Sequence, residues 1–438
     1  MRTLNSFANL SIAVLLAASS TALAQVAPAP VEAAPEAAPA VAIPEPAPAP
    51  VAEPTPPTPI PVPEVKPAEP AKAAAAGTKI SLYGFAQLNA IWEDGVVSPN
   101  QNNWNLTAPR DNGKGGSRTL LNVNHSRIGI NFSDSPTESG TELSGKIETD
   151  FNNSASRSNN GAGNFRIRHS YGQVKFSDLG LTLLFGQTSN VFSPRDPSVL
   201  SEGTGNYSGN IGSSRVPQIR LTQALGPAEI AVAAVDDRGA SAPKAPAVQG
   251  RIGFKTSADW ADSKQNLELG VSGHFAHERN TDTTEHQVNP KVPKSWSFNA
   301  DLNLPIIDIL GLSGEFFLGQ NLKNYANGSL GQTSSITKNG TDGVKSIGYW
   351  ANIGIKLPAS LTFNGGIGAE SISNDKDDLK QGGTIISNTG IFTNLRYNFI
   401  PSAFIGVEYW HISTEYNVDK DKDGSINRIE LAFNYAFK

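Results

Sequence analysis

The most regular feature of the sequence is an alternation of polar and apolar residues, which recurs in sixteen short segments between Thr78 and Lys438. The segment KSIGYWANIGIKL shows it most clearly, because Ile347 and Tyr349 share one face while Ser346 shares the other with further polar residues. Successive side chains of a β-strand point to opposite sides of a sheet, so a period of two is typical of a strand that is apolar on one side. The pattern therefore predicts sixteen amphipathic strands.

The connections between these segments are alternately long and short. Tight turns are expected at residues 134–140, 177–180, 225–227, 258–262, 305–310, 357–359 and 400–402. Several of them contain proline, which cannot donate a hydrogen bond inside a strand ladder. A barrel that crosses an outer membrane has short turns on the periplasmic side and longer loops outside. We therefore predict an all-β fold, a 16-stranded antiparallel transmembrane β-barrel over residues 78–438, with both ends on the periplasmic side.

Residues 1–24 have the pattern of an export signal peptide. Arg2 precedes an apolar run at residues 12–18, and the small residues Ala22 and Ala24 follow it. The run is shorter than the roughly 20 residues that a membrane-spanning helix needs. No later stretch is long and apolar enough to form such a helix, so any insertion into a membrane must be by strands. Strands can pair all their backbone groups there only in a closed barrel.

Residues 25–77 are almost wholly Pro, Ala, Val and Glu. They offer no aromatic side chains to bury, and repeated proline favours an extended polyproline II chain. We predict a disordered periplasmic spacer. Two interpretations of it stay open, a solubilising tail without contacts and a tether that touches the peptidoglycan of the cell wall.

The chain has no cysteine, which excludes disulfides, thiol nucleophiles and zinc–thiolate sites. The formal net charge is -5, and the spacer contributes most of it through six glutamates and two lysines. The barrel region is nearly balanced, which argues against a nucleic-acid partner. No cofactor is expected, and the expected surroundings of the barrel are outer-membrane lipid and lipopolysaccharide.

Applied along the segments, the same alternation assigns a set of cations to the polar face, which would face the barrel interior. They are Arg127, Lys146, Arg166, Arg168, Arg220, Arg251, Lys255, Lys356, Arg396 and Arg428. Cations that line a narrow aqueous path lower the barrier for anions. The same faces also carry carboxylates, among them Glu148, Asp150, Glu268, Asp301, Glu370, Glu408 and Glu430. Guidance of anions and pairing across neighbouring strands therefore remain alternative roles for these cations.

The long connection at residues 188–217 holds Arg195 among glycines and prolines. Long loops inside compact domains are often functional, so we expect this one to fold inward, narrow the pore and add Arg195 to its lining. The alternative is an exterior loop that touches only solvent or lipopolysaccharide.

A calcium-loop pattern occurs near the C-terminus, where Asp419, Asp421, Asp423, Gly424 and Glu430 have EF-hand spacing. An EF-hand needs helices on both sides, whereas both flanking segments alternate as strands. The pattern is better explained by a charged hairpin loop with an Asp-Gly turn, and weak calcium binding between lipopolysaccharide molecules is the alternative.

Catalysis finds little support in the sequence. No nucleophile elbow, metal-binding helix or phosphate loop is present, and the six histidines are scattered. His169 lies on a predicted strand beside Tyr171, where a wall residue is the simplest interpretation. We therefore predict that the protein is not an enzyme.

Several segments resemble, in order, the DcaP-like trimeric porins of Gram-negative outer membranes. They are SLYGFAQLNAIW (residues 81–92), SRIGINF (126–132), KIETDFN (146–152), FRIRHSYGQVKF (165–176) and LLFGQTSNVF (183–192). The resemblance implies sixteen strands, a homotrimer, and uptake of small anionic solutes such as dicarboxylates through an arginine-lined constriction. It favours Arg127, Arg166 and Arg168 as lumen cations, with Arg195 as a looser match.

One departure from these porins is clear. Members of the family often carry an N-terminal heptad-patterned helix, whereas a proline-rich spacer cannot form a coiled coil. Trimerisation would then rest on the barrel walls, where the small residues Gly84 and Ala86 permit close contact.

The sequence thus predicts an outer-membrane porin for passive diffusion of small hydrophilic solutes, with a preference for anions. One alternative is an envelope tether in which the barrel anchors the spacer. A second is an oligosaccharide channel, since Tyr83, Phe85 and Trp350 have interior parity and could stack on sugar faces. A third, a barrel-embedded hydrolase, lacks an evident base beside a nucleophile.

Overall fold

The computed structural model describes residues 77–95, 107–110, 115–151, 165–200, 208–212, 214–236, 246–261, 265–277, 294–325, 328–340, 342–418 and 423–438. The predicted signal peptide (1–24) lies outside these residues, and so does the predicted spacer (25–77) except for Gly77.

Within the described residues the chain forms seventeen strands and five short 3-10 helices. The strands are β1 (Lys79–Glu93), β2 (Arg118–Asn122), β3 (Arg127–Ser133), β4 (Thr141–Asp150), β5 (Arg166–Phe176), β6 (Leu181–Ser189), β7 (Arg215–Leu225), β8 (Ala228–Val235), β9 (Ala247–Ser257), β10 (Asn266–His277), β11 (Lys294–Ile307), β12 (Leu310–Gln320), β13 (Lys345–Leu357), β14 (Leu361–Ile372), β15 (Ile385–Ile400), β16 (Ala403–Tyr416) and β17 (Gly424–Phe437). The 3-10 helices are η3 (Ser177–Leu179), η4 (Asp259–Ala261), η5 (Ser329–Gly331), η6 (Ser334–Ile336) and η7 (Lys376–Asp378).

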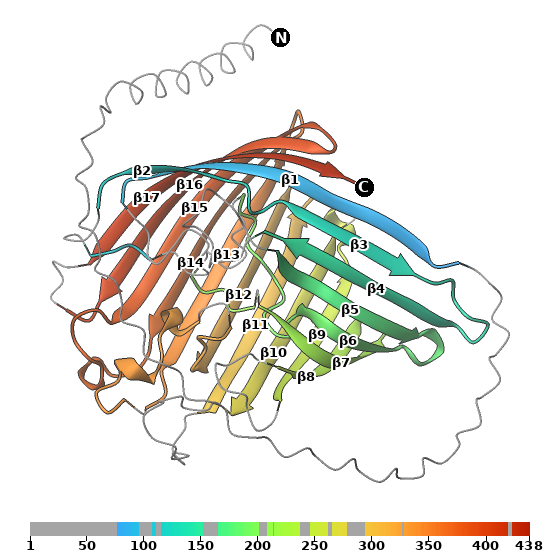
Figure 1. Cartoon of the computed structure of the whole chain (residues 1–438), viewed down its shortest axis with the longest axis horizontal. Coiled ribbons are helices and arrows are strands. Elements are labelled where there is room, and N and C mark those ends of the chain that lie inside the picture. Colours follow the sequence, from blue (N-terminus) through green and yellow to red (C-terminus); the bar gives the residue numbers. More distant parts are fainter. Residues whose placement is uncertain are drawn as a thin grey trace, which may run out of the picture. The chain divides into compact units, whose positions relative to one another are not determined.

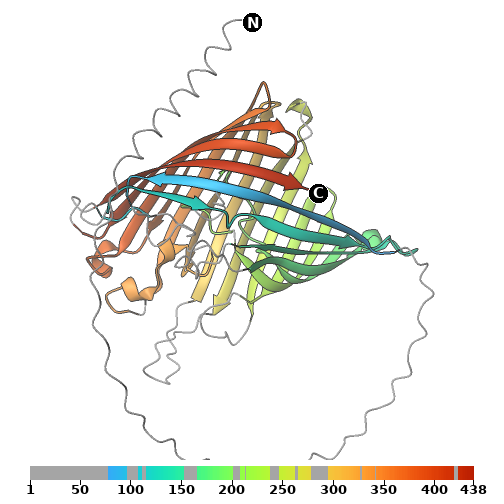
Figure 2. The same ribbon diagram turned by 45° about the horizontal axis from the view of Figure 1, so that its top comes forward.

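The strands close into one antiparallel barrel (Figure 1). From β3 to β17 each strand pairs with the next one in the chain, and β1 pairs with β17 and with both β2 and β3, so the sheet closes on itself. Figure 2 shows β1 lying between β17 and the β2–β3 pair. Because β2 and β3 pair with β1 one after the other, they are two halves of a single crossing strand, and sixteen strands span the wall. The predicted fold class is therefore confirmed.

The alternation predicts one of the sixteen strands at about residues 119–132; the structure has this crossing strand but interrupts it, because the chain leaves the ladder at residues 123–126. There, the three residues 86–88 of β1 lie opposite the four residues 123–126, so the partner segment has one residue more than β1. Side chains replace the ladder, since the backbone N–H of Gln87 donates to Ser126 Oγ (3.0 Å) and that of Asn124 to Asn122 Oδ1 (2.8 Å). Polar side chains that bond the local backbone compete with regular pairing in this way.

The two faces of the wall differ as the alternation predicted. On β13, Trp350 is 1% exposed whereas the adjacent Tyr349 is 46% exposed. Large apolar residues such as Ile128, Phe254 and Val271 are also exposed on the outward face. No helix among the described residues has the length and apolar character needed to cross a membrane. An apolar outer belt around a polar interior is the pattern of a transmembrane barrel.

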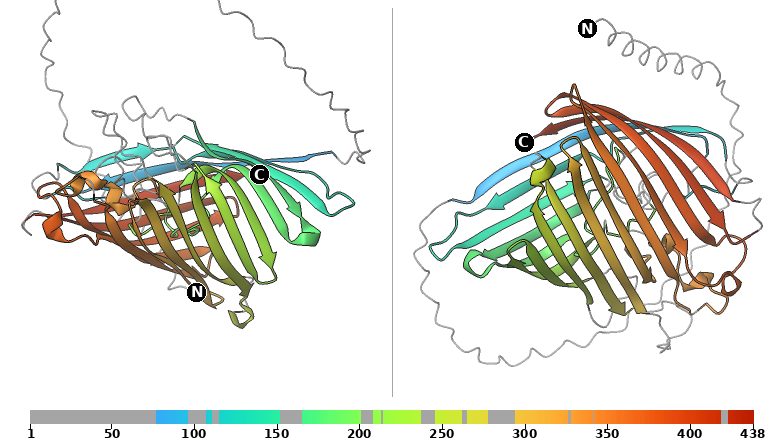
Figure 3. Two further views of the ribbon diagram at one scale, coloured as in Figure 1. Left: turned by 90° about the horizontal axis from the view of Figure 1, so that it is seen from below. Right: turned by 180° about the vertical axis from the view of Figure 1, so that it is seen from behind.

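The expected tight turns lie at one end of the barrel. Residues 226–227, 308–309, 358–360 and 401–402 turn directly from one strand into the next. Figure 3 shows the barrel from below and from behind, with the strands running between its two ends. Short turns mark the periplasmic end of outer-membrane barrels.

One glycine of β1 lies where the barrel closes. Gly84 is directly opposite Phe437 of β17, and a Cβ added to Gly84 would lie 2.5 Å from the Phe437 ring and 2.3 Å from the carbonyl oxygen of Arg127. An aromatic ring that packs over a glycine in this way strengthens a strand pair. Gly84 is therefore covered within the same chain, which leaves Ala86 as the more exposed of the two small residues.

Candidate pore constriction

The connection between β6 and β7 leaves the wall and crosses the interior of the barrel. Its first residues run past β9 and β10, where the backbone N–H of Val191 donates to Gln249 Oε1 (2.9 Å) and that of Ser193 donates to Ser272 Oγ (3.3 Å). Phe192, between them, is 0% exposed. The prediction that this loop folds inward is therefore confirmed.

Glu315 on β12 is the central anchor of this loop, and it is 5% exposed. Its carboxylate accepts hydrogen bonds from the Ser193 hydroxyl (2.5 Å) and from the backbone N–H of Arg195 (2.7 Å). The Trp350 indole N–H donates a third (3.2 Å). A buried carboxylate is stable only when such donors surround it, so the loop and Glu315 depend on each other.

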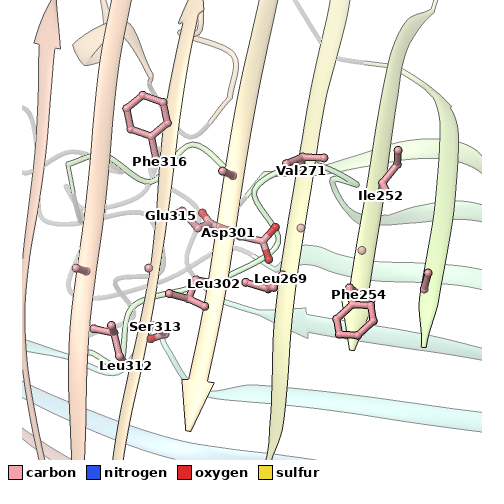
Figure 4. A pocket seen from close by; sticks show the side chains of 16 residues that line it. Ile252, Phe254, Leu269, Val271, Asp301, Leu302, Leu312, Ser313, Glu315 and Phe316 are labelled. Carbon is pink, nitrogen blue, oxygen red and sulfur yellow. The ribbon is translucent and has the colours of Figure 1, made fainter. Parts of the chain in front are cut away.

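The guanidinium of Arg195 fastens the same part of the loop to β10 and β11. It donates to Asp301 Oδ1 (2.9 Å) and to Glu268 Oε2 (2.8 Å). Asp301 is directly opposite Glu315 in the strand register, and Figure 4 shows the two carboxylates side by side, among residues that line a groove in this part of the wall. Asp301 also pairs with Arg251 of β9.

The loop then reaches the far side of the interior. The backbone N–H of Ser198 donates to Asn352 Oδ1 of β13 (2.9 Å), and that of Leu200 donates to Glu408 Oε2 of β16 (2.6 Å). The carbonyl oxygen of Leu200 accepts a bond from Gln87 of β1 (3.2 Å). Wall side chains from β9 to β16 and β1 therefore hold residues 191–200 across the lumen.

Four predicted pore-lining cations gather around two carboxylates on β3, β4 and β5. The ion pairs are Arg127–Glu148 (3.5 Å), Lys146–Glu148 (3.9 Å), Arg166–Asp150 (2.6 Å), Arg168–Glu148 (2.7 Å) and Arg168–Asp150 (2.7 Å). We call these six side chains the basic cluster. Counted by themselves, these six side chains carry four positive and two negative formal charges, a surplus of two positive charges within the set. Three of the four cations keep 22–28% of their side-chain surface exposed.

The other predicted cations are placed differently. Arg195, Arg251 and Lys255 form ion pairs with Glu229, Glu268 and Asp301, so this second group is formally balanced. Arg220 lies on the interior face of β7, next in register to Ala233. Arg396, on β15, stacks on the ring of Phe404 at 4.0 Å. Among the ion pairs between described residues, the second group thus has as many carboxylates as cations, whereas the basic cluster has more cations than carboxylates.

The predicted aromatic and histidine candidates are engaged within the wall. Trp350 lies beneath the loop, the Tyr83 hydroxyl donates to Glu148 (2.6 Å), and Phe85 stacks against Arg127 at 5.1 Å. None of these contacts favours an oligosaccharide track. His169 Nδ1 hydrogen-bonds the Thr188 hydroxyl at 2.9 Å, as expected of a wall residue.

The described residues of the EF-hand pattern have separate partners. Asp419 and Asp421 lie outside the described residues. Strands flank the loop on both sides, and Asp423 accepts a bond from the backbone N–H of Tyr416 (2.9 Å). Glu430 is buried in the wall, where it bonds Asn89 and Arg428. The hairpin interpretation therefore accounts for the described part of the pattern.

Sequence reasoning missed the residues that anchor the loop. Gln249, Ser272 and Glu315 all have interior parity, and that parity was the available signal. The sequence does not show which of many interior polar residues will meet a loop from elsewhere in the chain.

Known proteins share the fold of this chain. Residues 65–255 match the model of the family described as DcaP outer membrane protein, and no curated protein matches the chain in sequence. The outer membrane channel DcaP of Acinetobacter baumannii is 20% identical, with a TM-score of 0.65 over 83% of this chain and 99% of that chain. Salmonella typhi OmpF, in complex with daunomycin, is 12% identical, with a TM-score of 0.54 over 83% and 99%. The trimer form of Vibrio cholerae OmpT is 11% identical, with a TM-score of 0.50 over 82% and 99%.

The match covers the part of the barrel that carries the basic cluster. The structural likeness extends over the whole wall, because it covers 83% of this chain. Together, the closed barrel, the inward loop and the family match identify the chain as a channel-type β-barrel of the outer membrane that resembles the DcaP proteins.

Proposed function

We propose that this barrel is a porin through which small hydrophilic solutes diffuse passively, with a preference for anions such as small dicarboxylates. The observation that carries the proposal is the surplus of cations in the basic cluster. Its side chains reach the lumen from β3–β5, whereas the bonds described above fasten the loop to β9–β16 and β1. Fixed charge in a narrow aqueous path concentrates counter-ions, and low-dielectric walls strengthen the effect.

Removing two arginines from the basic cluster is expected to abolish its anion preference. In the Arg166→Ala/Arg168→Ala double variant the cluster falls from a surplus of two positive charges to none. We expect the reversal potential of the purified protein, measured in planar bilayers under a potassium chloride gradient, to move from the chloride side to zero or to the potassium side. An unchanged reversal potential would contradict the proposed role of the cluster.

The opposite change gives the matched control. Asp150→Asn removes one carboxylate from between Arg166 and Arg168 and raises the formal surplus to three. We expect the reversal potential to move further to the chloride side, because the electrostatic effect depends on the sign of the cluster and not on its shape. A shift in the same direction for both variants would indicate a general disturbance of the wall.

We also propose that the porin assembles as a homotrimer within the outer membrane. The support is the trimer form in which Vibrio cholerae OmpT was determined, a barrel of the same fold. Native mass spectrometry of the detergent-solubilised protein should give three chains per particle. A monomeric mass in several mild detergents would contradict the assembly without affecting the proposed conductance.

A further inference from the structure

A second set of lumen-facing cations lies near the tight turns, on a different part of the wall. Lys356 of β13 is directly opposite Thr362 of β14, and Thr362 is directly opposite Arg396 of β15. All three have the interior parity of Trp350 and of Asn394, which are buried inside the barrel. Because adjacent strands are about 4.8 Å apart, the two cations flank the Thr362 hydroxyl roughly 10 Å from each other.

These two cations lack the carboxylate partners that other periplasmic-end cations have. Lys175 pairs with Glu142 at 2.9 Å, and Lys255 pairs with Glu268 at 2.9 Å. In the part of the chain that the structure describes, no carboxylate oxygen lies within 4 Å of Lys356 or Arg396. The two charges are therefore not neutralised by described groups of the wall.

The guanidinium of Arg396 is already held in place. It stacks on the Phe404 ring at 4.0 Å, and its Nε donates to Asn398 Oδ1 (3.0 Å). Its two terminal nitrogens make no hydrogen bond to another described residue. A planar fork of donors fixed in this way suits two-point binding of a carboxylate or phosphate, and little side-chain entropy remains to be lost.

We propose that Arg396, Lys356 and Thr362 form an anion-binding site at the periplasmic mouth of the pore. It would take a small solute that carries a carboxylate or phosphate group. Arg396 binds two oxygens of that group, Lys356 adds charge from the side, and the Thr362 hydroxyl donates a hydrogen bond between them. The site adds a second anion-binding position, on β13–β15, to the proposed porin. It rests on the proposed function, because only anions that pass the basic cluster would reach it from outside.

Cysteine chemistry tests this proposal, because the chain has no native cysteine. A Thr362→Cys variant places one thiol between the two cations. Its modification by an anionic and by a cationic methanethiosulfonate reagent is followed as a change in conductance, and the ratio of the two rates reports the local potential. With Lys356→Gln and Arg396→Gln added, we expect the anionic-to-cationic ratio to fall roughly three- to tenfold at 0.1 M salt.

A matched control separates this site from the overall charge of the pore. Lys175→Gln in the Thr362→Cys background removes one positive charge from β5, as Lys356→Gln alone does from β13. Because Lys175 has a carboxylate partner, its removal should leave the ratio unchanged, whereas Lys356→Gln alone should lower it. Inorganic phosphate should slow modification by a neutral reagent in Thr362→Cys but not when Lys356 and Arg396 are also replaced. A ratio insensitive to Lys356→Gln and Arg396→Gln, or equal protection by phosphate in both backgrounds, would overturn the site.

Failure of this inference can be told from failure of the proposed function. In one outcome, Arg166→Ala/Arg168→Ala shifts the reversal potential while Lys356→Gln and Arg396→Gln leave the ratio of modification rates at Thr362→Cys unchanged. In that case only the proposed periplasmic site is wrong. If the ratio responds and the reversal potential does not, the site exists but the basic cluster does not set selectivity. Each variant is checked for folding by the heat-dependent migration of the barrel in detergent gels.

Discussion

Replacing Glu315 with alanine is expected to release the loop from β12 and to widen the passage. The carboxylate accepts bonds from Ser193, Arg195 and Trp350, and none of these donors has an equivalent acceptor in the variant. A buried donor left without its acceptor costs about 1–3 kcal/mol, so the loop loses several kcal/mol of anchoring. We expect a higher single-channel conductance and larger current fluctuations in planar bilayers.

Two further variants make this result specific. Glu315→Gln keeps the size of the side chain and one acceptor oxygen, so its conductance should lie between those of the native protein and the alanine variant. Glu370→Ala removes an equally buried interior carboxylate, which instead accepts a bond from the backbone N–H of Leu330 at 3.3 Å. If Glu370→Ala widened the pore as much as Glu315→Ala, the effect would not come from the anchored loop.

Replacing Arg428 with alanine is expected to destabilise the barrel by about 3–5 kcal/mol. Arg428 is 1% exposed and bonds Glu93 (3.2 Å) and Glu430 (2.9 Å), both of which are fully buried. Glu408 lies directly opposite Glu430 on the neighbouring strand. Without the guanidinium, three carboxylates share one short stretch of wall, and desolvation and repulsion act together. Urea unfolding in detergent micelles measures the change.

The neighbouring Arg118 gives the control for this prediction. It also pairs with Glu93, at 2.7 Å, but its side chain is 24% exposed to solvent. Water screens a pair of this kind, so Arg118→Ala should cost about 1 kcal/mol or less. Equal losses for the two variants would show that burial of Arg428 does not control the stability of this part of the wall.

The strands, and the side of the wall on which each side chain lies, could be predicted because one rule applies to every strand. A membrane barrel must alternate apolar and polar side chains, so parity along β13 placed Trp350 inside and Tyr349 outside without tertiary information. The rule fails where a residue is inserted into one strand of a pair. Such an insertion reverses the parity, so interior positions are even-numbered in β2 and odd-numbered in β3.

The balance between guidance and pairing could not be predicted, because it depends on which charges meet in space. Arg166 and Arg195 have the same charge and both face the interior, yet Arg166 belongs to a cluster with a surplus and Arg195 to a balanced group. The loop brings Arg195 to Asp301 from 106 residues away in the chain. Periodicity encodes the face on which a residue lies, whereas its partner depends on the closed barrel.

Pairing between β1 and β17 has a consequence for biogenesis. The first described strand finds its second neighbour only when β17 (Gly424–Phe437) has been made. Until then the sheet has two open edges whose N–H and C=O groups have no partners, and such edges recruit other chains. Unlike a protein that can begin folding from its N-terminus, this chain can close its wall only once β17 has been made, so a product truncated before Gly424 would remain an aggregation-prone open sheet.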